Sequence, residues 1–244
     1  MDLHEVINAK AKALWEKYAA AEQIETMPMF YPKLKSGAIL FVGLNPSFSG
    51  KGDFYLKESD IGEKSIQEVF RWAQISDEKI LAATKAEYLF RSEYPYYSEF
   101  QRIAGELNSQ WEHIDLFFYR ETSQNELRQK LFQKVPDFKE DSLLIDNNFR
   151  PFFMDQLNLS IELMTELEPK LIVVVNALAA NILYAKLGLK KTFDENSGAY
   201  SLVLKDGSCC PILLASMLSG QRAMDTFSKE RLVWHMEKVL KGLS

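Results

Sequence analysis

The sequence predicts an α/β protein in which a mostly parallel sheet lies between two layers of helices, formed as one domain over residues 1–244. Three observations support this fold class. Short apolar runs are bounded by turn-forming residues, which is typical of strands buried on both faces of a parallel sheet. Segments with helical periodicity separate these runs. The chain contains no internal repeat, low-complexity tract or interdomain linker.

The N-terminal half is expected to form a helix and then enter the sheet. Residues 2–24 carry apolar side chains at helical spacing, and two prolines at 28 and 32 end this segment. We expect the helical segment 1–30 to pack on the rest of the domain. The first strand covers residues 39–42. Further helices are predicted at 63–73, at 77–90 and, after an aromatic joint at 94–97, across positions 100–107.

The C-terminal half alternates strands and helices. Strands are predicted at 114–119, 171–175, 200–205 and 210–215, the last two joined by a turn at Asp206-Gly207. Helices are predicted from a capping box at Ser123 to about 134, at 150–167, at 177–187 and from Ser228 to about 240.

The composition and charge bear on the kinds of partner that the protein can bind. The chain has 47% hydrophobic and 26% charged residues, a net charge of −5 and a pI of about 5.4. This balance counts against a broad, non-specific nucleic-acid surface. A local basic strip remains possible, because residues 33–51 hold three lysines and no acid, and residues 219–244 hold five basic and three acidic residues.

Targeting and metal-binding signals are absent from the sequence. The N-terminus lacks a basic and apolar leader, and no run approaches the ~18 apolar residues of a membrane span. Cys209 and Cys210 are adjacent, so they cannot form a CxxC pair, and the three histidines are scattered. We therefore expect a cytoplasmic monomer with no membrane, metal or cofactor.

Polar residues follow four of the predicted strands. Asn45-Pro46-Ser47 follows the first, Asp115 and Arg120 accompany the second, Asn176 ends the third, and residues 216–222 follow the last. Open α/β sheets bind ligands at the carboxyl ends of their strands, so these residues are candidates for one site. An ordinary strand-to-loop exit at Asn45 is the alternative on pattern alone.

The order of these residues resembles the uracil-DNA glycosylase superfamily, in its mismatch-specific branch. Gly43-Leu44-Asn45-Pro46-Ser47 is similar to the Gly-x-Asn-Pro-Gly motif of that branch. Residues 169–179 look like its third-strand segment, and Ser216 to Arg222 resembles the loop that enters DNA. The resemblance spans roughly residues 37–240, and only the first motif is specific. It implies a four-stranded, mostly parallel sheet between helices.

The resemblance also implies a hydrolase that flips uracil or a related damaged or mismatched base out of DNA and cleaves its N-glycosidic bond. Asn45 would hold the attacking water through its carbonyl oxygen, and Pro46 would stiffen the loop that aims it. Gly43, Leu44 and Ser47 complete the expected base-binding loop. Phe48 would stack on the extracted base or, alternatively, belong to the core.

The remaining candidates include two departures from the family pattern. Asp115 stands roughly where the superfamily keeps a base-reading Asn, and a carboxylate cannot donate to a uracil carbonyl unless it is protonated. The usual histidine of the last motif is replaced near Ala215 or Ser216, which should slow catalysis. We keep Ser216 as a catalytic candidate. Asn176 would bind a base edge or, alternatively, cap a helix.

The loop that resembles a DNA-entering segment supplies the other candidates. Met217 and Leu218 would act as the apolar wedge that fills the gap left by a flipped base, or form a surface turn with one buried leucine. Ser219 would bind a DNA phosphate, and Arg222 would supply positive charge toward the phosphates. The four cysteines of the iron–sulfur branches are missing, so no cluster is expected.

Two hypotheses of function follow. The first is a DNA glycosylase acting on uracil or a related base. The second is a catalytically weak or inactive nucleic-acid or nucleotide-binding member of the same fold, suggested by the acidic pI, the missing histidine and Asp115. A small-molecule enzyme of Rossmann type lacks support, because no glycine-rich phosphate loop is present.

Overall fold

A computed structural model describes residues 2–47, 65–72, 76–134, 148–220 and 223–242. Its sheet has the strand order β2-β1-β3-β5-β4. Strands β1 (Ile39–Gly43), β2 (Trp111–Asp115), β3 (Leu171–Val174) and β5 (Cys209–Leu214) are parallel, and β4 (Tyr200–Val203) pairs antiparallel with β5. The α/β class and the mostly parallel sheet are confirmed.

The expectation of a four-stranded sheet is wrong, because the described residues form a sheet of five strands. The fifth is β4, the first strand of the hairpin that turns at Asp206-Gly207. Gly207 has φ +86°, the left-handed conformation that such a turn favours. Because β4 and β5 form a hairpin, β4 pairs antiparallel with β5 at the edge of the four parallel strands.

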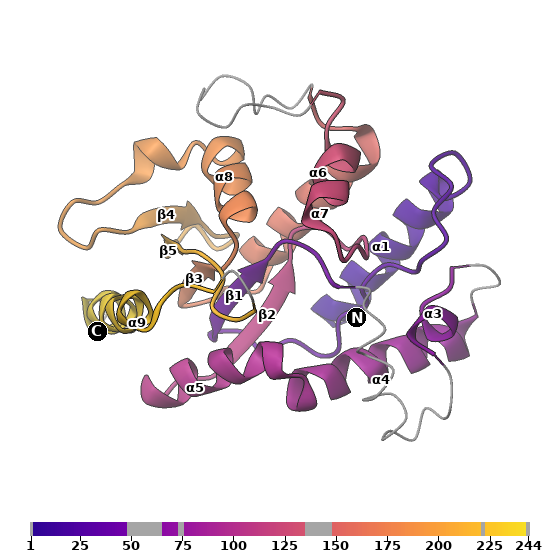
Figure 1. The fold of residues 1–244 in the computed structure, drawn as a ribbon. Helices are drawn as coiled ribbons and strands as arrows, with labels where there is room; N and C mark the ends of the chain where they lie inside the picture. The colour runs from indigo at the N-terminus through magenta and orange to yellow at the C-terminus, as the bar shows by residue number, and fades with distance from the viewer. Residues whose placement is uncertain (1, 48–64, 73–75, 135–147, 221–222, 243–244) are drawn as a thin grey trace.

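Helices cover both faces of the sheet (Figure 1). One layer contains α1 (Leu3–Tyr18), α6 (Gln124–Leu131), α7 (Pro151–Glu166) and α8 (Ala177–Lys186). The other contains α3 (Ile66–Val69), α4 (Asp77–Glu93), the 3₁₀ turn η1 (Pro95–Tyr97), α5 (Ser98–Glu106) and α9 (Thr226–Gly242). A second 3₁₀ turn, η3 (Leu189–Thr192), follows α8.

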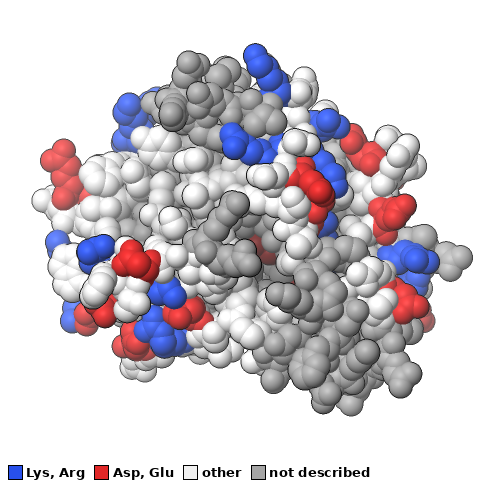
Figure 2. Space-filling model, viewed as in Figure 1, with Lys and Arg blue, Asp and Glu red and all other residues white. Residues whose placement is uncertain are grey.

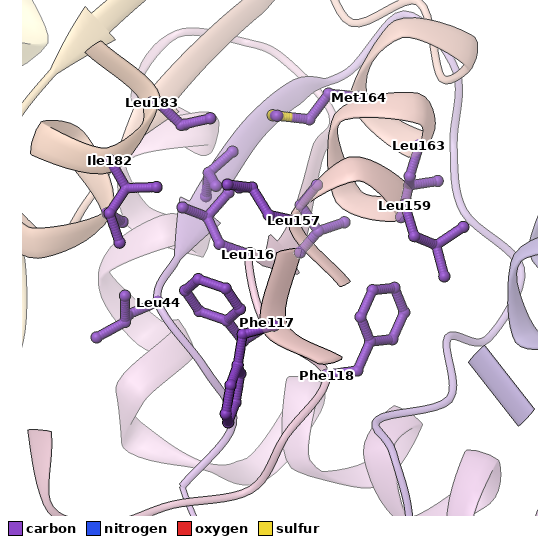
Figure 3. Packing of buried hydrophobic residues seen from close by; sticks show 14 of the residues in the cluster. Leu44, Leu116, Phe117, Phe118, Leu157, Leu159, Leu163, Met164, Ile182 and Leu183 are labelled. Atoms are coloured by element: carbon purple, nitrogen blue, oxygen red, sulfur yellow. The ribbon is translucent and has the colours of Figure 1, made fainter. Parts of the chain in front are cut away.

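Alternate residues of β1 pack into two separate hydrophobic clusters, one on each face of the sheet. Leu40 and Val42 pack in the cluster under α7 and α8, whereas Ile39 and Phe41 pack in the cluster under α4 and α5. Figure 3 shows part of the first cluster, in which residues of α7 and α8 meet the segment that follows β2. Every residue of β1 is buried, as expected for a central strand with helices on both faces.

Strand β2 differs most from the predicted elements. The apolar run suggested a strand at 114–119, but β2 begins at Trp111 and ends at Asp115. Leu116, Phe117 and Phe118 are fully buried outside the strand. An apolar run indicates that residues are buried, but it does not show that they pair in a sheet. The prediction therefore placed this strand too far along the chain.

Three helix boundaries also differ from prediction. The first helix ends at Tyr18 rather than near 24, and Gln23 beyond it has φ +52°. Within the described part of 63–73, the helix covers only Ile66–Val69. The last helix begins at Thr226, and the Asp225 carboxylate accepts from the backbone N–H of Ser228, so Ser228 lies inside the helix. The first helix packs on α7, with Trp15 and Phe152 rings 4.9 Å apart.

Candidate functional site

The sheet reverses its strand order at β1, and the candidate site lies at that point. The chain places β2 on one side of β1 and β3 on the other, so the loops leaving β1 and β3 diverge. Ligand crevices of open α/β sheets form at such switch points. A cavity of about 300 Å³ lies here, and Asn45, Asp115 and Asn176 all line it. Three of the predicted strand ends therefore meet at one cavity.

Asn45 joins the loop after β1 to the segment after β2. Its Nδ2 donates to the backbone carbonyl oxygens of Glu121 at 2.7 Å, Pro46 at 3.1 Å and Tyr119 at 3.4 Å. Three acceptors around one atom fix the amide orientation, because only the nitrogen can donate. Within the described residues no hydrogen bond uses Oδ1 of Asn45. The oxygen is thus available to accept from water or a ligand.

Gly43 allows Asp115 to approach the first strand. The two residues are paired across β1 and β2. A Cβ at position 43 would lie 2.1 Å from Oδ1 of Asp115 and 2.9 Å from Nε2 of His113. The glycine of the motif is therefore required here by close packing. Leu44 and Ser47 line the same cavity as Asn45, together with Pro46.

Asp115 is a buried carboxyl that lines the cavity. Its side chain is 5% exposed, and its backbone N–H donates to the Tyr31 hydroxyl at 3.0 Å. Burial, together with the nearby Glu87 charge, raises the pKa of Asp115 to about 8, although Arg120 and Arg91 oppose the shift. The raised pKa favours the protonated form of this carboxyl near neutral pH. The protonated form both donates and accepts hydrogen bonds.

Asn176 caps α8 as well as lining the cavity. Its Oδ1 accepts from the backbone N–H of Leu178 at 2.9 Å and of Ala179 at 3.2 Å. The alternative of a helix cap is confirmed, because the residue sits at the N-cap of α8. Its oxygen is engaged by the helix, and its Nδ2 is the group left for a ligand.

An aromatic wall from α4 and η1 was not identified as part of the site from the sequence. Phe90, Tyr94, Tyr96 and Tyr97 line the cavity beside Ile66. Burial raises the pKa of Tyr96 and Tyr97 well above the usual value, so both phenols stay neutral. The Tyr-Pro-Tyr-Tyr sequence at 94–97 was the only available signal, and it indicated a joint between helices rather than a pocket wall.

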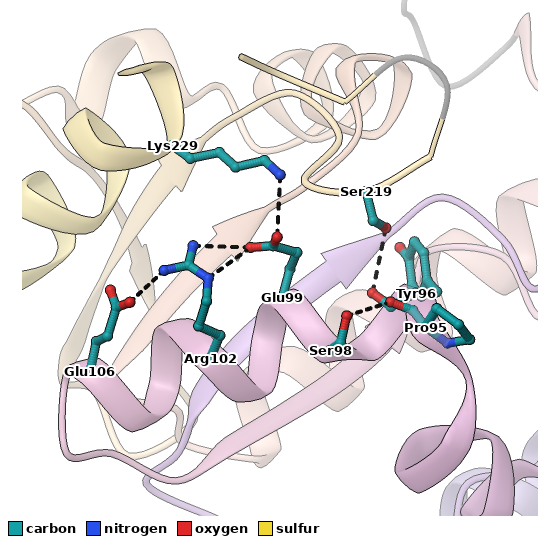
Figure 4. A network of polar contacts seen from close by, with 8 residues as sticks. All are labelled: Pro95, Tyr96, Ser98, Glu99, Arg102, Glu106, Ser219 and Lys229. Carbon is teal, nitrogen blue, oxygen red and sulfur yellow. Dashed lines mark hydrogen bonds and ion pairs between the residues drawn. The ribbon is translucent and has the colours of Figure 1, made fainter. Parts of the chain in front are cut away.

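The loop after β5 closes one side of the cavity. Met217 lines the cavity, but Leu218 is 2% exposed and belongs to the core cluster under α5. Ser219 Oγ donates to the Tyr96 carbonyl at 3.4 Å, which holds the loop against η1 (Figure 4). Nearby, Lys229 of α9 pairs with Glu99 of α5 at 3.4 Å. Ser216 is exposed and is not among the residues that line the cavity.

Two candidate residues lie outside the described part of the chain, namely Phe48 and Arg222.

Charges near the site are mixed in sign. On the face shown in Figure 2, Lys and Arg side chains lie beside Asp and Glu toward the margins of the view, and the described surface at its centre is mostly uncharged. Several Lys and Arg side chains lie near α6 and α8 in that view.

The described residues contain no cluster of three or more His, Cys, Asp or Glu side chains arranged to hold a metal ion. None of the helices in those same residues is long and apolar enough to cross a membrane. Comparison with protein-family models gives no match, and no curated protein matches the sequence. The functional argument therefore rests on the residues of the cavity.

Proposed function

We propose that this protein is a glycosylase-like hydrolase that takes uracil or a related base, flipped out of DNA, into the cavity and cleaves its N-glycosidic bond. The observation that carries the proposal is the meeting of Asn45, Asp115 and Asn176 at one cavity of about 300 Å³. These residues are 70 and 61 positions apart in the sequence, from 45 to 115 and from 115 to 176. They belong to three segments that the superfamily resemblance singles out.

The lining of the cavity suits a flat heterocycle. The rings of Phe90, Tyr94 and Tyr96 offer apolar and aromatic surface, on which bases pack regardless of sequence. Asp115 and Asn176 offer polar groups in the same lining. Such a combination of an apolar wall and a few placed polar groups is typical of small-ligand sites.

Asn45 has the geometry of a water-positioning residue. Its amide nitrogen is fixed on three carbonyls, so its oxygen has a defined direction. An amide cannot remove a proton, so this residue would orient water rather than act as a general base. Attack at the sugar carbon would then depend on departure of the base as an anion, which is stabilised by hydrogen-bond donors around it.

The test is release of the base from synthetic duplexes that contain uracil, hypoxanthine or mispaired thymine. Abasic sites are revealed by alkaline strand cleavage at stoichiometric protein. Asn45→Ala, purified in parallel, controls for contaminating host glycosylase and should show no product. The variant also loses the three Nδ2 hydrogen bonds, so circular dichroism must first show that it is folded. No abasic product with any of the three duplexes would refute the proposal.

A second candidate function is binding of a nucleobase or nucleic acid without base release. The absence of a histidine at 215–222 favours it, because that residue would stabilise the departing base. Salt-dependent binding of uracil-containing DNA, with no abasic product, would support this second function.

A further inference from the structure

Six ionisable side chains form a buried cluster beside the cavity. Their exposed fractions are low, and they come from α4, β2 and the segment that follows β2: Glu87, Arg91, Glu112, His113, Asp115 and Arg120. Arg120 pairs with Glu87, and its guanidinium lies 3.7 Å from the Phe70 ring centroid. Arg91 Nη1 binds Glu112 Oε2 at 2.6 Å, and its Nη2 donates to the His113 carbonyl at 2.6 Å.

The cluster holds three carboxyl groups but only two guanidinium groups. Each arginine is committed to a different glutamate, which leaves Asp115 as the carboxyl without a cation. His113 does not supply one, because burial lowers its pKa well below the usual value and keeps the ring neutral. Its Nε2 is 3.8 Å from Asp115 Oδ1, and neither ring nitrogen has a hydrogen-bond partner among the described residues.

The carboxyl oxygens of Asp115 are also without a hydrogen-bond partner in the described part of the chain, although the residue lines the cavity. A buried charge without a partner is so costly that the group becomes neutral instead. We propose that Asp115 recognises the bound base as a neutral carboxylic acid, and that Glu87, by occupying Arg120, is the positioning residue that keeps it in this form. This inference rests on the proposed function, because it assumes that the cavity takes a nucleobase.

The groups that face Asp115 act in opposite senses, and the groups that raise its pKa outweigh those that lower it. Burial, first, and then the Glu87 charge raise the pKa of Asp115 to about 8, against the opposing effect of Arg120 and Arg91. The phenols of Tyr96 and Tyr97 remain neutral and carry no charge toward it. The Tyr31 hydroxyl contacts only its backbone, accepting from N–H at 3.0 Å and donating to C=O at 3.3 Å.

Protonation decides which base edge Asp115 can bind. A neutral carboxylic acid has one O–H donor beside one C=O acceptor, which complements a ring carbonyl beside a ring N–H. Uracil, thymine and hypoxanthine carry this edge. An ionised carboxylate only accepts, so it would meet the carbonyl oxygen of such a base with repulsion. The departure from Asn to Asp is therefore compatible with uracil as long as the carboxyl keeps its proton.

The first measurement is direct. Infrared difference spectra of the wild-type protein and Asp115→Asn should show a protonated carboxylic-acid band at pH 7 that disappears with a midpoint near pH 8. This readout needs neither a ligand nor catalysis. Absence of the band at pH 7 would overturn the inference, whatever the protein does to DNA.

The second measurement is a calorimetric titration with free uracil between about pH 6 and about pH 9. Wild-type affinity should fall by about tenfold for each pH unit above the midpoint. Asp115→Asn cannot ionise at this position, so its affinity should follow only the titration of uracil itself. Glu87→Gln removes a negative charge and frees Arg120, so the midpoint should move to lower pH. Glu99→Gln is the matched control, because Glu99 also pairs with an arginine but lies on α5 outside the cluster, and it should leave the midpoint unchanged.

The outcomes separate this inference from the proposed function. The inference would be overturned if the affinity of the wild type for uracil did not change with pH. It would also be overturned if the pH midpoint of this affinity were the same in Glu87→Gln as in the wild type. Either result would count even if base release occurs. Uracil affinity that follows Asp115, together with no base release from DNA, would support the inference and refute the glycosylase proposal.

Discussion

Replacement of Gly43 by alanine tests the close approach of β1 and Asp115. The new Cβ would lie 2.1 Å from Oδ1 of Asp115, whereas ordinary contacts begin at 3.4 Å, so the oxygen must retreat by about 1.3 Å. Every residue of β1 is buried, so the strand cannot shift, and the Asp115 carboxyl can retreat only toward the cavity that it lines. Forcing an extra methyl group into such a packed region costs about 1–3 kcal/mol. At about 2–4 °C per kcal/mol for a chain of this size, the Tm should fall by about 2–12 °C.

Thermal unfolding followed by circular dichroism measures this change. Gly105→Ala is the matched control, because Gly105 lies in α5 and a Cβ added there would meet no atom within 4 Å. There the same substitution should leave stability unchanged or raise it by about 0.5–1 kcal/mol. The Asp115→Ala background removes the closest contact, so Gly43→Ala should cost less in it. An equal cost in both backgrounds, or a Tm within about 1 °C of wild type, would refute the packing argument.

Two further predictions concern the cavity residues. Asn176→Ala removes the two N-cap hydrogen bonds of α8, so the free energy of unfolding measured in urea should fall by about 1 kcal/mol. Asn176→Asp keeps an acceptor and should lower this free energy much less. Equal losses of stability in the two variants would contradict a capping role. Because the folded-state pKa of Asp115 is raised from 3.8 to about 8, its contribution to stability is present below pH 4 and is lost as the pH rises to about 8. The stability of wild type relative to Asp115→Asn should therefore decline across that interval in urea unfolding, and a constant difference would contradict the raised pKa.

The pattern of the sequence predicted much of the fold because burial leaves a clear signal in it. Residues 39–42 and 171–175 are apolar throughout, and both are central parallel strands. The second strand was placed wrongly at 114–119, because Glu112 and His113 are polar in sequence yet buried in the structure. Arg91 pairs with the buried Glu112 carboxylate from a helix more than 20 positions away, which no local pattern can indicate.

Sequence order by itself determined that Asn45 and Asn176 follow buried strands, because turn-forming and polar residues interrupt apolar runs there. It placed Asp115 within a strand, whereas the structure places it at the strand's last residue. Only the tertiary structure decided that these residues share a cavity with the aromatic wall of α4 and η1. It also decided the protonation of Asp115, because a carboxyl group responds to burial and to the pairing of its neighbours, and both depend on contacts between distant parts of the chain.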